Sequence, residues 1–312
     1  MPKSLSFIIF GASGDLTKRK LFPALLGLFS EKRLPQEFEI VGIGRTPYSD
    51  SEYRNYQHRQ LPKYIKTETW NEELVNSFIA HIRYETMDPA KEEGYYVLAK
   101  HLKASNSESV IYYLATPPLL YGVIPQHLKA FGLNDENTRI IVEKPFGYDL
   151  TSAKQLNDIY RDAFQEQQVY RMDHFLGKET AQNILAFRFA NSIFEPIWNR
   201  NYIDYVEITS VENLGIENRG GYYETAGTMR DMVQNHLVQL LALCAMEPPV
   251  KFDADSFRNE IVKVYDSLVP LTEDYIRENV IRGQYIAGGD KVGYRQETHV
   301  APDSRVETFF AM

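Results

Sequence analysis

One histidine on a predicted helix has the side chain that proton transfer near neutral pH requires. His236 lies within the apolar stripe of a helical pattern over 226–246, and Asp231 and Asn235 are on the same helix. An imidazole can serve as a general base, and a carboxylate partner fixes its tautomer. Most histidines on an apolar helix face are hydrogen-bonded core residues instead. The pattern therefore leaves a general base and a structural histidine as alternatives.

Two cationic side chains in the segment RMDHFLGKE, residues 171–179, have the spacing of an anion site. His174 and Lys178 are four residues apart, so one helical turn would bring both donors to the same side. The amino end of a helix favours anions, which indicates a phosphate grip. Asp173 and His174 can equally form a neutral hydrogen-bonded pair that is purely structural. The residues alone leave both interpretations open.

A glycine-rich turn joins the first strand-like run to a helical run, where a dinucleotide's pyrophosphate can bind. It departs from the pattern G-x-G-x-x-G at the second and third glycine positions, so an ordinary strand-to-helix turn is the alternative. The candidate cofactor-binding residues of this turn are Gly11, Ala12, Ser13, Gly14, Asp15, Leu16, Thr17 and Lys18.

The end of the second predicted strand bears on the choice between NAD and NADP. An NAD site places an acidic residue there, whereas an NADP site tolerates an arginine for the additional phosphate. Here the strand runs into Arg45 with no acidic residue beside it, which favours NADP. A solvated surface arginine is the alternative.

A fourth cationic candidate, Lys144, closes another predicted strand within the segment EKPFG. A cis Lys144-Pro145 bond would aim the lysine into a cleft. A loop lysine paired with Glu143 is the alternative, and it is the commoner state of adjacent opposite charges.

The elements that must position these residues form two patterns. In the first half, strand-like runs alternate with helical patterns, which predicts a Rossmann-type doubly wound parallel sheet. The strand-like runs are at 6–10, 39–43, 110–115, 139–143 and 168–172. Ligands bind at the carboxyl ends of such strands. The second half of the chain predicts an α+β domain with a largely antiparallel sheet. Its helical patterns are at 178–191 and 226–246, and its strand-like runs are at 206–211, 280–287 and 306–311. We expect an NADP-binding domain at 1–175 and a substrate and dimerisation domain at 176–312 that is incomplete at its carboxyl end, because the sequence stops within a strand pattern.

Composition narrows the class of protein. With 312 residues, 44% of them hydrophobic, the chain can bury the cores of two domains. Lys and Arg number 34 against 42 Asp and Glu, so a net charge of -8 argues against nucleic acid or anionic membranes as partners. The one cysteine excludes an internal disulfide and fits a cytoplasmic location. The apolar run at 5–10 is too short to span a membrane, and no targeting segment is evident.

The sequence resembles the glucose-6-phosphate dehydrogenase family in four ordered segments along the whole chain. They are GASGDLTKRKLFPAL from Gly11, IVEKPFG from Ile141, YRMDHFLGKE from Tyr170 and RGGYYETAGTMRDMVQNHLVQLLALCAMEPP from Arg219. The resemblance implies oxidation of D-glucose 6-phosphate to the 6-phosphogluconolactone with hydride transfer to NADP, the first oxidative step of the pentose phosphate pathway. It also implies NAD as an alternative cofactor and a homodimeric or homotetrameric full-length form.

The resemblance assigns a role to each matching residue. His236 is implied as the general base that takes the proton of the anomeric hydroxyl, with Asp173 as the carboxylate that orients it. His174 and Lys178 are implied as phosphate ligands. The residues implied to hold the sugar are Lys144, Glu212 and Asp231, with Lys144 also near the cofactor. The residues implied to bind NADP are the turn 11–18, Arg45 and Tyr121. The resemblance implies no metal.

Two departures from the family leave alternatives open. Phe175 stands where the family often has a tyrosine whose hydroxyl reaches the phosphate, and family members continue well past the match to Met312. The alternatives are an inactive NADP-binding relative and another sugar oxidoreductase with a Glu-Lys-Pro motif. The activity of the 312-residue chain itself stays open.

Overall fold

The computed structural model describes residues 2–65, 70–212, 215–289 and 291–312. The chain folds into two compact units, Met1–Met172 and Asp173–Met312. The domain boundary expected from the sequence is after residue 175, whereas this division falls after Met172. Each unit is described separately below.

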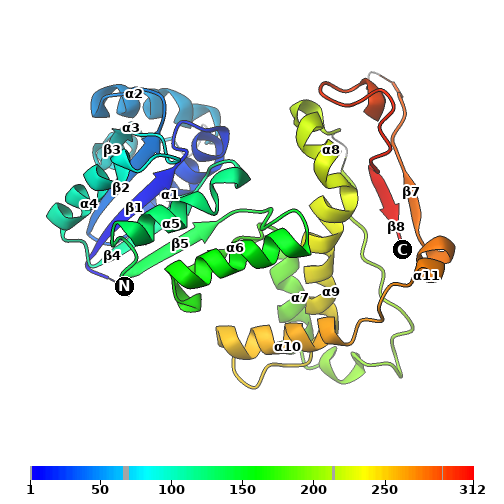
Figure 1. Ribbon diagram of the computed structural model, residues 1–312. Coiled ribbons are helices and arrows are strands. Elements are labelled where there is room, and N and C mark those ends of the chain that lie inside the picture. Colours follow the sequence, from blue (N-terminus) through cyan, green and yellow to red (C-terminus); the bar gives the residue numbers. More distant parts are fainter. Residues whose placement is uncertain (1, 66–69, 213–214, 290) are drawn as a thin grey trace. The chain divides into compact units, whose positions relative to one another are not determined.

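The first unit is built on a six-stranded parallel sheet (Figure 1). Its strands follow the order β3-β2-β1-β4-β5-β6, so the strand order reverses between β1 and β4. This is the arrangement of a dinucleotide-binding sheet, and the predicted doubly wound fold is confirmed. The strands are β1 (Ser4–Phe10), β2 (Glu37–Gly44), β3 (Ile82–Thr86), β4 (Ser109–Leu114), β5 (Thr138–Val142) and β6 (Val169–Arg171).

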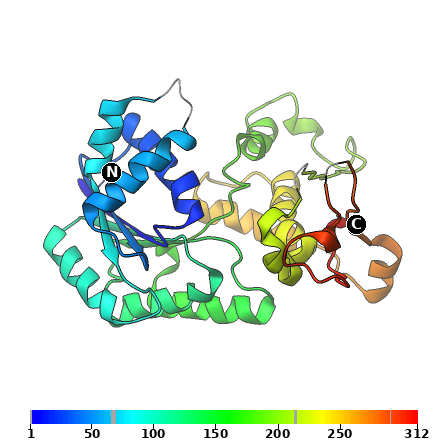
Figure 2. The same ribbon diagram turned by 90° about the horizontal axis from the view of Figure 1, so that it is seen from above.

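Helices cover both faces of this sheet because its side chains alternate between two buried clusters. Ile8 and its neighbour Ile9 are both fully buried but belong to different clusters, as the two-residue period of a strand requires. In Figure 2 the strands lie between two layers of helices. The helices are η1 (Thr17–Leu21), α1 (Phe22–Ser30), α2 (Asp50–Gln60), η2 (Leu61–Lys63), α3 (Glu72–Ala80), α4 (Glu93–Ser105), η4 (Pro118–Leu120), α5 (Val123–Ala130), α6 (Leu150–Ala163) and η5 (Glu166–Gln168).

The second unit consists mainly of helices (Figure 1). Helices α7, α9 and α10 share a small apolar cluster around Leu243 and Met246. Two short strands, β7 (Ile281–Gly283) and β8 (Phe309–Ala311), pair antiparallel, which confirms the predicted class of this domain. The helices are α7 (Glu179–Phe189), η6 (Glu195–Ile197), η7 (Glu217–Arg219), α8 (Gly220–Thr228), η8 (Met229–Leu237), α9 (Val238–Ala245), α10 (Ala254–Asp266), α11 (Glu273–Asn279) and η9 (Tyr294–Gln296).

Two expectations for the second unit need correction. The strand predicted at 206–211 is wrong, because this segment is irregular and no strand among the described residues pairs with its backbone. The helix predicted at 226–246 is interrupted near its start, because Gly227 has φ 65° and ψ 174°, so the helix that carries His236 is continuous only from Thr228, the other start that the pattern allows. From Met229 to Leu237 the helix then has π geometry, with hydrogen bonds to the fifth residue, before it continues as α9.

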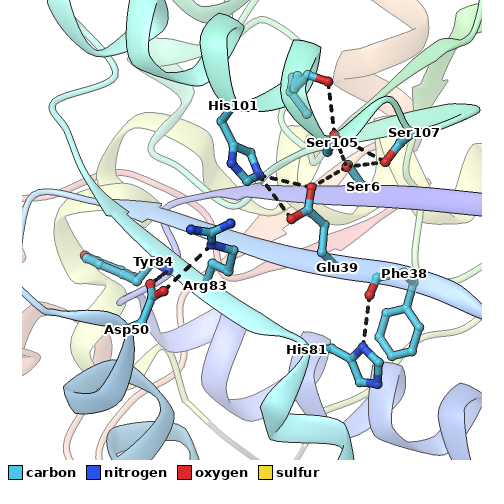
Figure 3. Close-up of polar contacts among 11 residues, drawn as sticks. Ser6, Phe38, Glu39, Asp50, His81, Arg83, Tyr84, His101, Ser105 and Ser107 are labelled. Carbon is cyan, nitrogen blue, oxygen red and sulfur yellow. Dashed lines mark hydrogen bonds and ion pairs between the residues drawn. The ribbon is translucent and has the colours of Figure 1, made fainter.

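A polar network ties α4 to the sheet of the first unit (Figure 3). His101 on α4 contacts both carboxylate oxygens of Glu39 on β2 at 3.0 Å, and the buried hydroxyl of Ser6 donates to Glu39 Oε1 at 2.6 Å. Burial raises the pKa of the Glu39 carboxyl, but the hydrogen bonds from His101 and Ser6 outweigh burial and hold the pKa below its usual range. Glu39 is therefore an ionised acceptor at neutral pH.

The network predicts a pH-dependent contribution to stability. Because the pKa of Glu39 is lowered on folding, its contribution is complete above the unfolded pKa of about 4.3 and is lost as the pH falls below it. Glu39→Gln should lower the free energy of unfolding by about 2 kcal/mol at pH 7. Urea unfolding between pH 3 and pH 7, measured beside the exposed control Glu37→Gln, checks this. A deficit that stays constant down to pH 3 would contradict the assignment.

Candidate active site

The glycine-rich turn lies where the strand order of the sheet reverses. Gly11 follows β1 with φ +85°, and a Cβ atom at this position would lie 2.2 Å from the carbonyl oxygen of Ala115, just past β4. No side chain fits there, so the chain passes close beside β4 only because residue 11 is glycine. The Gly11 and Ala12 amides both donate to the Ile43 carbonyl at 2.9 Å, which fixes the turn to the end of β2.

Within this turn, side chains differ in what they can offer a ligand. Ala12 and Thr17 are buried, and the Thr17 hydroxyl donates to the Gly11 carbonyl at 3.1 Å, so these two residues stabilise the turn. Asp15 is exposed and pairs with Lys18 at 2.9 Å; the hydrogen bonds from Lys18 and Arg19 lower the pKa of its carboxyl. A Cβ atom at Gly14 would lie 3.0 Å from the Gly11 carbonyl oxygen. The small residues at the close approaches fit a pyrophosphate cradle formed by backbone amides.

The register of the parallel strands brings other predicted residues to the same edge of the sheet. Phe10, Leu114 and Val142, the last residues of β1, β4 and β5, lie in one row. Arg45 follows β2 directly and is exposed, and Lys144 follows β5 in a cis bond to Pro145. The turn, Arg45 and Lys144 are therefore all at the carboxyl edge.

Tyr121, the remaining predicted cofactor residue, lies in a different environment. Its side chain is only 2% exposed and belongs to the core cluster that also contains Ile124 and Tyr160. A contact between Tyr121 and a cofactor stays a prediction.

A tyrosine that was not predicted from the sequence, Tyr113 on β4, donates its hydroxyl to Glu143 beside Lys144. Its position one residue before the end of a strand was the available signal.

The second unit brings Asp173 and His236 together, although they are 63 residues apart in the chain. Asp173 Oδ1 lies 2.6 Å from His236 Nδ1 and also accepts the Phe175 amide at 2.9 Å. Burial raises the pKa of the Asp173 carboxyl, but the hydrogen bonds from His236 and from the Phe175 amide outweigh burial and lower it. An ionised Asp173 fixes the proton on Nδ1, which leaves the lone pair of the imidazole on Nε2.

Burial of His236 distinguishes between the two interpretations of this residue. The ring is fully buried, as in a structural histidine, but Nε2 has no hydrogen-bond partner among the described residues. A structural histidine normally has both ring nitrogens satisfied, and an unsatisfied buried polar atom costs about 1–3 kcal/mol. One satisfied nitrogen and one unpartnered nitrogen is the state that a general base needs.

The predicted helical turn between His174 and Lys178 is wrong. Residues 174–177 form successive turns, and α7 begins only after Lys178. The physical reason is the Asp173 side chain, because it accepts the Phe175 amide and so competes with helical hydrogen bonding at this position. The Lys178 ammonium lies 3.6 Å from the ring centre of Phe175, and the His174 ring packs edge-on against His236 with centroids 4.7 Å apart.

The two remaining sugar-binding candidates differ in burial. Asp231 is buried on η8 and accepts the Tyr222 hydroxyl at 3.0 Å. Glu212 is exposed. Of the two carboxylates considered for His236, the structure pairs Asp173 with the imidazole. The roles of Asp231 and Glu212 stay predictions.

One group of side chains, within the part of the chain that the structure describes, has the residue types of a metal site. Asp173, His174 and His236 each offer a ligand atom, and these atoms lie within 4.8 Å of one another. An ion held by Asp173 and His236 Nδ1 would replace the proton that now joins them, so metal binding and the hydrogen-bonded pair exclude each other. The expectation that no metal takes part stays a prediction.

A glycine turn at the reversal point of a β3-β2-β1-β4-β5-β6 sheet defines the first unit as a dinucleotide-binding fold. Residues 8–183 match the family model described as glucose-6-phosphate dehydrogenase, NAD binding domain, and residues 185–312 match that of the C-terminal domain. The chain belongs to the glucose-6-phosphate dehydrogenase family.

Individual relatives agree with this assignment. The chain is 47% identical to glucose-6-phosphate 1-dehydrogenase of Aggregatibacter actinomycetemcomitans over 98% of its own length and 64% of the relative's. Identity to the Bacillus subtilis (strain 168) enzyme is 42%, over 99% and 64% of the two chains. The chain therefore spans about 64% of the length of these relatives.

Solved structures of the family have the same fold. A glucose-6-phosphate dehydrogenase in complex with its substrate glucose-6-phosphate is 36% identical with a TM-score of 0.86, covering 99% of this chain and 64% of that one. The Mycobacterium avium enzyme has a TM-score of 0.86 at 35% identity, covering 99% and 65%. Among the described residues, no helix combines the length and apolar character needed to cross a membrane.

The crowding at Gly11 predicts an unequal response of two glycines with positive φ. Gly11→Ala adds a steric clash to backbone strain and should lower the free energy of unfolding by about 3 kcal/mol. Gly132→Ala, at φ +66° with open space around it, should cost only about 1 kcal/mol. Urea unfolding of both variants measures the difference, and binding of a nicotinamide dinucleotide, followed by fluorescence, should weaken in Gly11→Ala alone. Equal effects of the two substitutions would show that the Ala115 contact does not matter.

Proposed function

We propose that this protein oxidises D-glucose 6-phosphate at its anomeric carbon to the 6-phosphogluconolactone, with NADP as the acceptor, in the first oxidative step of the pentose phosphate pathway. The observation that carries the proposal is the 2.6 Å contact between Asp173 Oδ1 and His236 Nδ1. Family membership supports it, as does the solved relative whose complex contains glucose-6-phosphate as its substrate.

In the proposed reaction, His236 Nε2 takes the proton from the anomeric hydroxyl. The carboxylate of Asp173 keeps the proton of Nδ1 in place and stabilises the positive charge that the imidazole acquires. A bound nicotinamide would accept the hydride from the anomeric carbon, so that the substrate loses one proton and one hydride. The step requires Nε2 to be unprotonated at the start, which its lack of a partner among the described residues allows.

The proposed cofactor site is the carboxyl edge of the sheet in the first unit. Backbone amides of the turn 11–18 would hold the pyrophosphate, since the close approaches at Gly11 and Gly14 leave no room for side chains. Arg45, exposed after β2, would bind the additional phosphate of NADP through two parallel hydrogen bonds. NADP is accordingly the proposed cofactor, and NAD the alternative.

The proposed substrate site contains the remaining candidates. Lys178 and His174, both exposed, would hold the phosphate, while Lys144, Glu212 and Asp231 would hold the sugar. Phe175 has no hydroxyl to add to the phosphate ligands. The homodimer or homotetramer and the cytoplasmic location stay predictions from the sequence.

The absorbance of the reduced nicotinamide near 340 nm, a property of the cofactor itself, separates this proposal from its alternatives. Turnover with glucose 6-phosphate but not with glucose supports the proposal. Turnover with unphosphorylated sugar alone favours another sugar oxidoreductase with a Glu-Lys-Pro motif, and NADP binding without any turnover favours an inactive relative.

His236→Asn should remove the general base without affecting the nucleotide-binding unit. We expect kcat to fall by at least about 100-fold, within the range for loss of acid–base catalysis, and the Kd for NADP to change by less than about twofold. Steady-state kinetics and fluorescence titration measure the two quantities. Loss of NADP affinity in parallel with kcat would place His236 outside this role.

Arg45→Ala should weaken NADP binding by about tenfold and leave NAD binding unchanged, since only NADP carries the additional phosphate. The matched control is Arg59→Ala, which removes an exposed arginine of α2 in the same unit. Dissociation constants for both cofactors, measured by titration at fixed ionic strength, test this. The assignment fails if the two cofactors weaken equally, or if the control behaves in the same way.

A further inference from the structure

The aromatic ring of Phe175 lies between the proposed general base and a proposed phosphate ligand. On one side, the His236 imidazole is nearly parallel to the ring, at 12°, with centroids 3.9 Å apart. The Lys178 ammonium nitrogen lies 3.6 Å from the centroid of the same ring. An ammonium and an imidazole at these distances would overlap if they shared one face. Lys178 and His236 therefore lie on opposite faces of Phe175.

The stack, defined here as Lys178, Phe175 and His236, matches the charge distribution of an aromatic ring. Both faces of the ring are electron-rich, so each attracts a cation or a polarised imidazole. The flat contact also limits rotation of the imidazole, whose other constraint is the hydrogen bond from Nδ1 to Asp173. Phe175 therefore contributes to the orientation of His236 without any polar atom of its own.

The burial of His236 shows why a covering residue matters. The imidazole is fully buried, while its Nε2 has no partner among the described residues. Phe175 covers one face of the imidazole, whereas the Nε2 lone pair lies in the ring plane, so the stack holds the ring without occupying Nε2.

We propose that Phe175 is a positioning residue that holds the His236 imidazole against Asp173 and holds the Lys178 ammonium until a phosphoryl group takes it. The proposal rests on the function proposed above. A phosphoryl group attracts an ammonium more strongly than an aromatic face does, because both partners are charged. Phosphate binding thus removes Lys178 from one face of Phe175, while the other face stays stacked on His236 and keeps the imidazole in place.

Nuclear magnetic resonance of the full-length protein labelled with ¹³C at the lysine ε carbon tests the stack directly. The ring current of Phe175 shifts the Lys178 ε protons upfield, and Lys178→Arg assigns this resonance by its disappearance. We expect inorganic phosphate and glucose 6-phosphate each to move the resonance downfield towards the position it has in Phe175→Leu. A resonance that is identical in the wild type and in Phe175→Leu, or that neither ligand moves at saturation, overturns the proposal.

Kinetics test the positioning of the base. Phe175→Leu should lower kcat roughly three- to tenfold, the value of a well-formed ring contact, without raising the KM for glucose 6-phosphate. Phe175→Tyr keeps both ring faces and should restore kcat. The matched control is Phe187→Leu, which removes another ring of this unit, stacked on Phe194 at the same 3.9 Å, and should change neither quantity.

Unchanged kcat in Phe175→Leu, a higher KM as its only effect, or an equal loss in Phe187→Leu overturns the positioning role. The phosphate titration of the wild type needs only Lys178→Arg for the assignment, so it decides the proposal even if Phe175→Leu does not fold. It also separates the two proposals. If the wild type does not oxidise glucose 6-phosphate, the proposed function fails, while the Lys178 resonance still reports whether a phosphoryl group removes the lysine from the ring.

Discussion

The hydrogen bond between Asp173 and His236 is the constraint on which the candidate site depends. It joins two segments that are 63 residues apart and defines which imidazole nitrogen carries the proton. The half-buried carboxylate is tolerated because two donors offset the cost of its burial and keep its pKa low. With Nδ1 occupied, Nε2 becomes the one ring position open to chemistry, and Phe175 and His174 are arranged around that ring.

The first unit depends on a different constraint, the close passage of two chain segments at the reversal point of the sheet. Gly11 lies against the Ala115 carbonyl, and the parallel register brings Arg45 and Lys144 to the same edge. A parallel sheet needs helices on both faces, which leaves the strand ends as the place for ligands. The two units thus supply different components, a cradle of backbone amides and a pair of titratable side chains.

Much of the first unit could be predicted because its strands are apolar and end in glycine or charged residues. Strand β3 was missed, since as an edge strand it alternates Ile82 and Tyr84 with exposed or half-exposed polar residues. The Asp173–His236 pair could not follow from spacing, because tertiary contact alone brings these residues together, and only the family resemblance indicated it. The turns at 174–177 escaped prediction because a single side-chain hydrogen bond displaced the helix.

The π geometry of Met229–Leu237 has a consequence for how this site can vary among relatives. A π turn accommodates one residue more than an α turn, and such segments often mark functional positions. Deleting a single residue there would let the segment relax to an ordinary α-helix, and the side chains within the segment, His236 among them, would change direction. Insertions and deletions should therefore be tolerated in the irregular segment 203–212 and selected against between residues 229 and 237, where chain length itself sets the direction of the imidazole.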